Sequence, residues 1–216
     1  MNRSVILSDF DNTIVNIDAA AFALDRFADP SWKRIQARFE AGNITFEDSI
    51  REEYAMINAP ENVILDALDR VVSLRPHFDE LVEHCRKNNL PFTVVSAGLE
   101  FTIRHFLNQK GWLKFIEIYA PKAEYTRHGY KLRFPKFFDE SSINFKHDLV
   151  KYHQKRGSRV IFIGDGLGDF PAAREADLRF AIKGSNLAVA CLKGNIACSE
   201  VIDFQEVIDE TRNYVG

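Results

Sequence analysis

Two acidic motifs carry most of the chemical information in this chain, because each places carboxylates directly after an apolar run. Asp9 and Asp11 follow Val5-Ile6-Leu7, whereas Asp165 and Asp169 follow Val160-Ile161-Phe162-Ile163. Such runs are typical of buried parallel strands, and ligands of open α/β sheets bind just beyond the carboxyl ends of these strands. Carboxylates gathered there form a hard-oxygen site of the kind that Mg²⁺ prefers. The sequence therefore predicts a magnesium site suited to phosphoryl transfer.

The acidic residues suggest separate roles. The Asp9 carboxylate can attack phosphorus and form an aspartyl-phosphate, which divides a difficult hydrolysis into two steps. Asp11 lies two residues further on, on the same side of an extended backbone, and can serve first as general acid and then as general base. Asp165 would hold Mg²⁺ together with Asp9 and the backbone carbonyl of Asp11. Asp169 would bind the metal through water or orient its ligands.

Two further motifs are candidates for binding the phosphoryl oxygens. Ser96-Ala97-Gly98 ends a second apolar run and opens a helix, so its hydroxyl and backbone amides are suited to phosphate. Lys146 precedes an amphipathic helix that leads to a later strand, and it offers a fixed cation. Each motif alone is commonly a turn or a solvated side chain. Their order along the chain favours one catalytic set comprising Asp9, Asp11, Ser96 and Lys146.

The pattern around these motifs predicts an α/β fold with a doubly wound parallel sheet. Apolar runs predict strands, and amphipathic stretches between most of them predict helices. The strands are expected at about 5–8, 92–96, 115–119, 160–163 and 179–182, and the helices at about 78–87, 100–108, 147–155 and 170–176.

Residues 16–73 interrupt this alternation and predict a small inserted α-helical cap. No strand pattern occurs there; three helical stretches are expected, from Asp29-Pro30 to Ala41, after Thr45, and after Ala59-Pro60. The catalytic core would then comprise residues 1–15 and 74–216. A second irregular region, 120–142, contains a predicted hairpin over 125–132.

Composition limits the remaining possibilities. The chain has 216 residues, 46% of them hydrophobic, which suits one α/β domain with a small insert. A net charge of −3 with interspersed signs argues against a nucleic-acid partner. No apolar run is long enough to span a bilayer and no signal-peptide pattern is present, so we expect no membrane partner. Three cysteines without metal-ligand spacing predict reduced thiols in a cytoplasmic protein. The oligomeric state is left open.

The four motifs resemble those of the haloacid dehalogenase superfamily of aspartate-nucleophile phosphatases. The resemblance covers the whole chain, because a helical cap between the first and second motifs marks the branch that contains phosphoserine phosphatases. It implies a Rossmann-like core with a parallel sheet, a Mg²⁺ cofactor, a mobile cap, and a small phosphorylated metabolite as substrate. Hydrolysis and phosphotransfer to another acceptor remain alternatives, as does a non-catalytic phosphate-binding module.

Two families of this branch compete. Several stretches, among them Leu74-Arg75-Pro76-His77-Phe78, resemble the 2-hydroxy-3-keto-5-methylthiopentenyl-1-phosphate phosphatases of methionine salvage, although Asn144-Phe145 replaces their cysteine-rich segment. In phosphoserine phosphatases a cap acid binds the substrate amine, a phenylalanine follows, and an arginine binds the carboxylate. Asp18 and Phe46 match the first two positions, but Glu53 falls on the third. This resemblance disfavours phosphoserine and makes Asp18, Phe46 and the nearby Arg51 candidates for substrate specificity.

Overall fold

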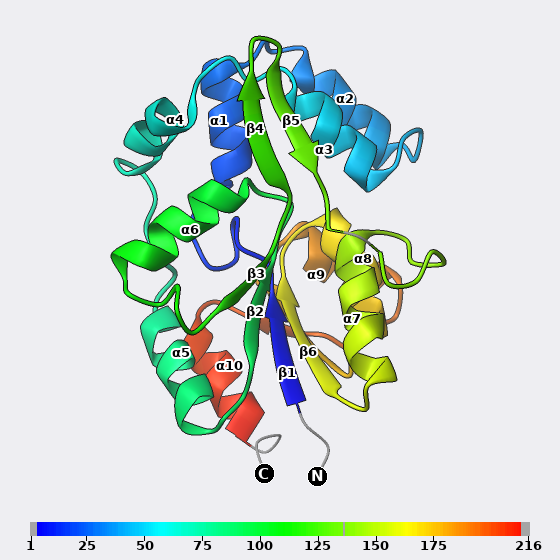
Figure 1. Cartoon of the computed structure of the whole chain (residues 1–216). Helices are drawn as coiled ribbons and strands as arrows, with labels where there is room; N and C mark the ends of the chain where they lie inside the picture. Colours follow the sequence, from blue (N-terminus) through cyan, green and yellow to red (C-terminus); the bar gives the residue numbers. More distant parts are fainter. Residues whose placement is uncertain (1–3, 136, 213–216) are drawn as a thin grey trace.

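The computed structural model describes residues 4–135 and 137–212, and its centre is a parallel sheet (Figure 1). Six strands pair in parallel in the order β3-β2-β1-β6-β7-β8. Their bounds are β1 Ser4–Ser8, β2 Phe92–Val95, β3 Glu117–Tyr119, β6 Arg159–Gly164, β7 Leu178–Ile182 and β8 Ser199–Val201. The α/β fold expected from the sequence is confirmed, and β8 is an addition to it.

Helices cover both faces of this sheet, because side chains of both faces are apolar. Along β1, Ile6 belongs to one buried cluster, whereas Val5 and Leu7 belong to the other. The alternation follows from the two-residue period of a strand. The cluster around Ile6 includes α5 (Phe78–Lys87), α6 (Glu100–Gln109) and α10 (Phe204–Thr211); the other includes α7 (Phe145–Lys155), α8 (Phe170–Glu175) and α9 (Asn186–Lys193).

The block between β1 and α5 is helical, as predicted, but it holds four helices in place of the expected three. They are α1 (Ala19–Phe27), α2 (Trp32–Glu40), α3 (Phe46–Tyr54) and α4 (Glu61–Leu68). The unexpected helix is α1, which begins where the Asp18 side chain accepts a hydrogen bond from the Ala21 amide at 2.7 Å. The block leaves and rejoins the core at one place, since Val15 and Leu74 form an antiparallel bridge. We call residues 16–73 the cap.

The predicted hairpin is present, and it contacts the cap. Strands β4 (Lys122–Thr126) and β5 (Gly129–Arg133) form a separate antiparallel pair that extends beyond the sheet in Figure 1. Gly129 has φ +85°, and a Cβ there would overlap the backbone carbonyl of Ala55. The Tyr130 hydroxyl donates a hydrogen bond to the Ala59 carbonyl at 3.0 Å. The hairpin, although distant in sequence, therefore packs on the cap.

Helix α7 begins earlier than the sequence analysis predicted. It begins at Phe145, so Lys146 lies in its first turn, whereas the prediction placed Lys146 before the helix. The Asn144 side chain accepts a hydrogen bond from the His147 amide at 2.9 Å and so caps the helix. Within the described ranges, no helix has the length and hydropathy that a bilayer crossing requires.

Candidate active site

The strand order explains why the predicted motifs meet. Strand β1 lies between β2 and β6, and the three run in parallel, so their carboxyl ends share one edge of the sheet. Asp9, Ser96 and Asp165 each follow one of these strands directly. The Asp9 amide donates a hydrogen bond to the Ile163 carbonyl at 2.8 Å, which holds the first and last motifs together. The expected convergence at this edge is confirmed.

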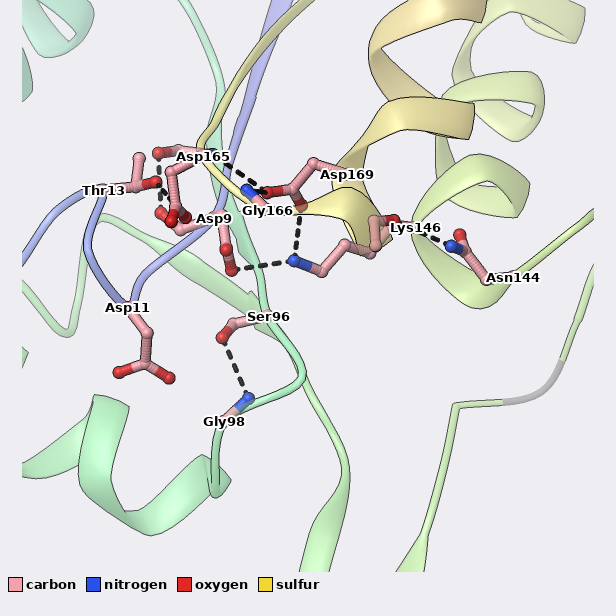
Figure 2. Close-up of polar contacts among 12 residues, drawn as sticks. Asp9, Asp11, Thr13, Ser96, Gly98, Asn144, Lys146, Asp165, Gly166 and Asp169 are labelled. Atoms are coloured by element: carbon pink, nitrogen blue, oxygen red, sulfur yellow. Dashed lines mark hydrogen bonds and ion pairs between the residues drawn. The ribbon is translucent and has the colours of Figure 1, made fainter. Parts of the chain in front are cut away.

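Lys146 enters the same edge from α7 and joins two carboxylates (Figure 2). Its Nζ lies 2.9 Å from Asp9 Oδ1 and 2.6 Å from Asp169 Oδ1, and its side chain is 3% exposed. Burial acts to lower the pKa of Lys146, but the charges of Asp169 and Asp9 together raise it above its ordinary value. Lys146 is therefore a fixed cation beside the predicted nucleophile.

Both oxygens of Asp169 have hydrogen-bond partners. Oδ1 accepts from Lys146, while Oδ2 accepts from the amides of Asp165 and Gly166 at 3.0 and 2.9 Å. A Cβ at Gly164 would lie 2.6 Å from Asp169 Oδ2, so glycine is needed for this close approach. Asp169 thus orients the loop after β6 and Lys146, which fits an indirect role toward a metal ion better than direct coordination.

The donor set fits a divalent cation. Asp9, Asp165 and Asp169 can each offer one oxygen, and these atoms lie within 4.8 Å of one another. Burial, with the neighbouring carboxylate Asp169, raises the pKa of Asp9 to about 7; burial, with Asp9, raises that of Asp165 to about 8. A cation bound there would offset this repulsion. Hard carboxylate oxygens around a small gap are suited to Mg²⁺.

Asp11 contacts both the cap and the second motif, which contains Ser96. Asp11 Oδ1 accepts a hydrogen bond from the Ala19 amide at 3.0 Å, which joins it to the start of α1. A Cβ at Gly98 would lie 2.7 Å from Asp11 Oδ2, so glycine permits the approach of the second motif. The Gly98 amide donates to Ser96 Oγ at 3.0 Å (Figure 2). Burial, followed by the charges of Asp18 and Asp9, raises the pKa of Asp11 well above its ordinary range.

A cavity of about 240 Å³ lies over these residues and is lined by both core and cap. Asp18 and Phe46 line it, as the sequence analysis proposed, and so does Glu53. Arg51 is not brought to this cavity. Its guanidinium lies 4.6 Å from the Phe134 ring centroid and 3.4 Å from Asp48. Two residues along a helix are separated by about 200°, so Arg51 and Glu53 point in different directions.

Sequence reasoning missed residues that position the motifs through backbone contacts. Arg75 Nε donates to the Thr13 carbonyl at 2.7 Å, and its other nitrogens reach the carbonyls of Asn12 and Ile202. Asn12 has φ +52°, so Arg75 binds a turn with an uncommon backbone conformation. Such contacts to carbonyl groups leave no motif in the sequence. The sequence analysis noted Arg75 only as part of the Leu74–Phe78 stretch and assigned it no role.

A second missed feature connects cap and core. The buried Glu47 carboxylate accepts a hydrogen bond from the Phe145 amide at 2.8 Å, and the rings of Phe46 and Phe145 stack with centroids 6.1 Å apart. Phe46 also lies against the loop after β6, since a Cβ at Gly168 would overlap its ring. These contacts place the start of α3 directly over the core part of the cavity.

Comparison with known proteins identifies the class. The family model described as haloacid dehalogenase-like hydrolase matches residues 6–174. The chain belongs to this family, and it is a phosphatase.

Curated relatives are similar over nearly the whole chain. A 2-hydroxy-3-keto-5-methylthiopentenyl-1-phosphate phosphatase of Bacillus cereus (strain B4264) is 25% identical, with 96% of this chain and 95% of the relative covered. A polyol phosphate phosphatase of Saccharomyces cerevisiae (strain ATCC 204508 / S288c) is 27% identical, with 96% and 92% covered.

Solved structures confirm the fold. A phosphoserine phosphatase with an analogue of its phospho-aspartyl intermediate superposes with a TM-score of 0.72 at 19% identity and covers 100% of both chains. A substrate-bound phosphoserine phosphatase complex gives a TM-score of 0.70 at 18% identity over the same coverage.

Proposed function

We propose that this protein is a Mg²⁺-dependent phosphomonoester hydrolase that acts on a small phosphorylated metabolite and uses Asp9 as its nucleophile. The observation that carries the proposal is the position of the Asp9 carboxylate. It is 7% exposed, lines the cavity, and is held by Lys146 next to Asp165 and Asp169. A buried, oriented carboxylate beside a fixed cation can attack a bound phosphoryl group.

Side chains and amides of the site account for both steps of the reaction, the phosphorylation of Asp9 and the hydrolysis of the aspartyl-phosphate. Asp9 attacks phosphorus, and the bond to the leaving oxygen breaks while Asp11 donates a proton to that oxygen. Asp11 then accepts a proton from water, which attacks the phosphoryl group and frees Asp9 and inorganic phosphate. The Lys146 ammonium, the Ser96 hydroxyl and the Ala97 amide bind phosphoryl oxygens, while the Gly98 amide, which donates to Ser96 Oγ, orients that hydroxyl. Mg²⁺, held by Asp9 and Asp165 and oriented through Asp169, would offset the repulsion between carboxylate and phosphate.

Residues 16–73 act as the cap domain in this proposal. The contacts of Phe46 and Glu47 with the start of α7 support closure of the cap over the cavity. Closure excludes water from the reacting group, and opening exchanges product for substrate. Specificity would then depend on the cap residues Asp18, Phe46 and Glu53.

A methionine-salvage type of substrate is the second candidate. The aromatic residues Trp32, Phe39 and Phe46 are part of the cavity lining, which suits an apolar substrate group. The relatives named for 2-hydroxy-3-keto-5-methylthiopentenyl-1-phosphate support the same idea. The phosphoserine alternative lacks a cation for the substrate carboxylate at the position of Glu53. Phosphotransfer uses the same covalent intermediate and differs only in the acceptor.

The test is hydrolysis of p-nitrophenyl phosphate with Mg²⁺ and with chelator, by the wild type and by Asp9→Asn. We expect the variant to lose turnover and keep its fold, because an amide cannot replace the attacking carboxylate. Asp209→Asn is the matched control, since Asp209 is exposed on α10 beside Arg212. Turnover by Asp9→Asn with deamidation excluded by mass spectrometry, or undiminished wild-type activity in chelator, would refute the proposal.

A further inference from the structure

The guanidinium group of Arg75 donates to backbone carbonyls at the point where the cap returns to the core. Its Nε donates to the Thr13 carbonyl at 2.7 Å, one Nη donates to the Ile202 carbonyl at 3.0 Å, and the other donates to the Asn12 carbonyl. Among the described residues, no carboxylate forms an ion pair with Arg75. Charge-assisted hydrogen bonds are strong, and the planar fork of an arginine fixes their directions. Arg75 therefore holds two backbone segments, the turn after Asp11 and the loop after β8.

The turn after Asp11 has a backbone that needs support. Asn12 has φ +52°, a left-handed conformation that is uncommon for residues other than glycine. Arg75 binds the carbonyls of Asn12 and Thr13, which flank Thr13 on both sides. Two bonds to successive carbonyls fix the orientation of the residue between them, so Arg75 determines where the Thr13 side chain points.

Thr13 links this turn to the last acidic motif. Its buried hydroxyl donates a hydrogen bond to Asp165 Oδ1 at 3.2 Å (Figure 2). Asp165 is a proposed ligand of Mg²⁺, and a group that hydrogen-bonds to a metal ligand orients that ligand. Burial lowers the pKa of Arg75 and the charge of Asp165 acts to raise it, so the two side chains are close enough for their charges to interact. A chain of contacts thus runs from Arg75 through Thr13 to Asp165.

Arg75 is anchored to the core, although it follows the cap in sequence. Its amide donates to the Ile14 carbonyl at 2.8 Å, beside the bridge between Val15 and Leu74. Its third carbonyl partner, Ile202, follows β8 and belongs to the core. Arg75 thus holds the turn to the core where the two connections of the cap meet, and movement of the cap need not disturb the turn.

We propose that Arg75 is a positioning residue for the metal site: it holds the turn of Asn12 and Thr13 to the core, so that Thr13 keeps the Asp165 carboxylate oriented for Mg²⁺. This role rests on the Mg²⁺-dependent function proposed above. Arg75 is absent from the described residues that line the cavity, so it acts through Thr13 and not by contact with substrate.

Positioning and charge predict opposite effects of removing Arg75. The charge of Arg75 repels a cation bound at Asp165, so loss of that charge alone would strengthen Mg²⁺ binding. Loss of positioning would weaken it, because Asp165 would no longer be held in one orientation. The sign of the change in Mg²⁺ affinity therefore distinguishes the two effects.

Calorimetric titration of the substrate-free, full-length protein with Mg²⁺ measures this affinity. We expect Arg75→Met to raise the Kd for Mg²⁺ by about 10- to 100-fold, the usual cost of removing a group that orients a metal ligand. Arg75→Lys keeps the charge but not the planar fork; it should also raise the Kd, and it serves if Arg75→Met does not fold. The Mg²⁺ concentration for half-maximal hydrolysis of p-nitrophenyl phosphate should rise in parallel. Arg104→Met is the matched control and should keep the wild-type Kd, because Arg104 is exposed on α6 and pairs with Glu100 at 2.7 Å.

A second substitution assigns the effect to the chain of contacts. Thr13→Val keeps the shape of the side chain and removes its hydroxyl, so it should raise the Kd for Mg²⁺ by about 10-fold. Arg75→Lys combined with Thr13→Val should bind Mg²⁺ little more weakly than the weaker single variant, because both changes break the same chain. A merely structural role of Arg75 would lower thermal stability without this dependence on Thr13.

The outcomes separate this inference from the proposed function. A Kd in folded Arg75→Met or Arg75→Lys that equals the wild-type value or falls below it would overturn the inference alone. Losses of affinity that multiply in the double variant would also overturn it. In both cases, hydrolysis of p-nitrophenyl phosphate that requires Asp9 and Mg²⁺ would still support the phosphatase function. A wild type that neither binds Mg²⁺ nor needs it for hydrolysis would overturn both.

Discussion

Replacing Glu53 with glutamine should make the protein increasingly resistant to unfolding, relative to the wild type, as the pH rises. The pKa of Glu53 is 4.5 in its ordinary state and about 8 in the fold, chiefly because of burial. The folded protein therefore keeps a proton that the unfolded chain releases. The stability that this bound proton contributes is complete below pH 4.5 and is lost as the pH rises to about 8. Glutamine has no proton to lose, so the variant should lack this dependence.

The size of this stability difference follows from the two pKa values of Glu53. They are separated by about 3.5 pH units, and each unit corresponds to about 1.4 kcal/mol. The free energy of unfolding of Glu53→Gln minus that of the wild type should therefore rise by at most about 5 kcal/mol between pH 4.5 and 8. Relaxation around the charged carboxylate would reduce this to a few kcal/mol. The cavity opening near Glu53 favours the smaller value.

Denaturant unfolding at intervals of half a pH unit measures this difference. The experiment is done in chelator, so that metal binding does not contribute, and Asp48→Asn serves as the control, because Asp48 is exposed on the same helix. The two-state slope m must agree between proteins at each pH for the comparison to hold. A difference between Glu53→Gln and wild type that stays constant from pH 5 to 8 would refute the idea that Glu53 is buried and without a partner.

Other predictions test the site and its contact with the cap. Asp11→Asn should slow hydrolysis of alkyl phosphates by about 10²-fold and of activated aryl phosphates by less; equal losses in single-turnover rates would contradict its role as general acid. Asp165→Ala should abolish activity and weaken Mg²⁺ binding, measured by calorimetry, since it removes a proposed ligand; unchanged binding would contradict the assignment. Gly168→Ala should displace the Phe46 ring, lower stability by about 1–3 kcal/mol and change the order of substrate preference, as thermal unfolding and kinetics would show. Gly129→Ala should lower stability by at least as much, because it adds strain at φ +85° to an overlap with the cap backbone; an unfolding free energy equal to that of the wild type would contradict this packing.

The sequence predicted the core of the site because its signals are local. Asp9, Ser96 and Asp165 each follow an apolar run, and parallel neighbours bring such positions to one edge. Lys146 was found as well, but its helix begins two residues earlier than expected, because the capping role of Asn144 was not recognised. Strand β8 is three residues long and has no pattern that could reveal it.

The cap was harder to predict, because its details depend on contacts between distant residues. Helix α1 was missed because Asp18 was interpreted only as a substrate-binding residue, whereas its side chain also caps the helix. The directions in which Arg51 and Glu53 point depend on the rotation of α3 about its own axis. The packing of the helix determines this rotation, and the sequence does not reveal it. The link between Glu47 and Phe145 joins segments 98 residues apart and leaves no local signal.

The contact between the hairpin and the cap limits how this protein can be divided. A truncation designed from the sequence would remove residues 16–73 and join the two parts of the core at Val15 and Leu74, which already lie together. That truncation would uncover Tyr130, which is 3% exposed and bonds to Ala59, and would leave the β4–β5 pair with its contacts to α6, such as that of Tyr130 with Phe101, but without those to the cap. Two-stranded hairpins are marginally stable in water, so the lost contacts matter. A minimal core should therefore omit the hairpin together with the helices, and an exchange of caps between related enzymes should transfer both segments.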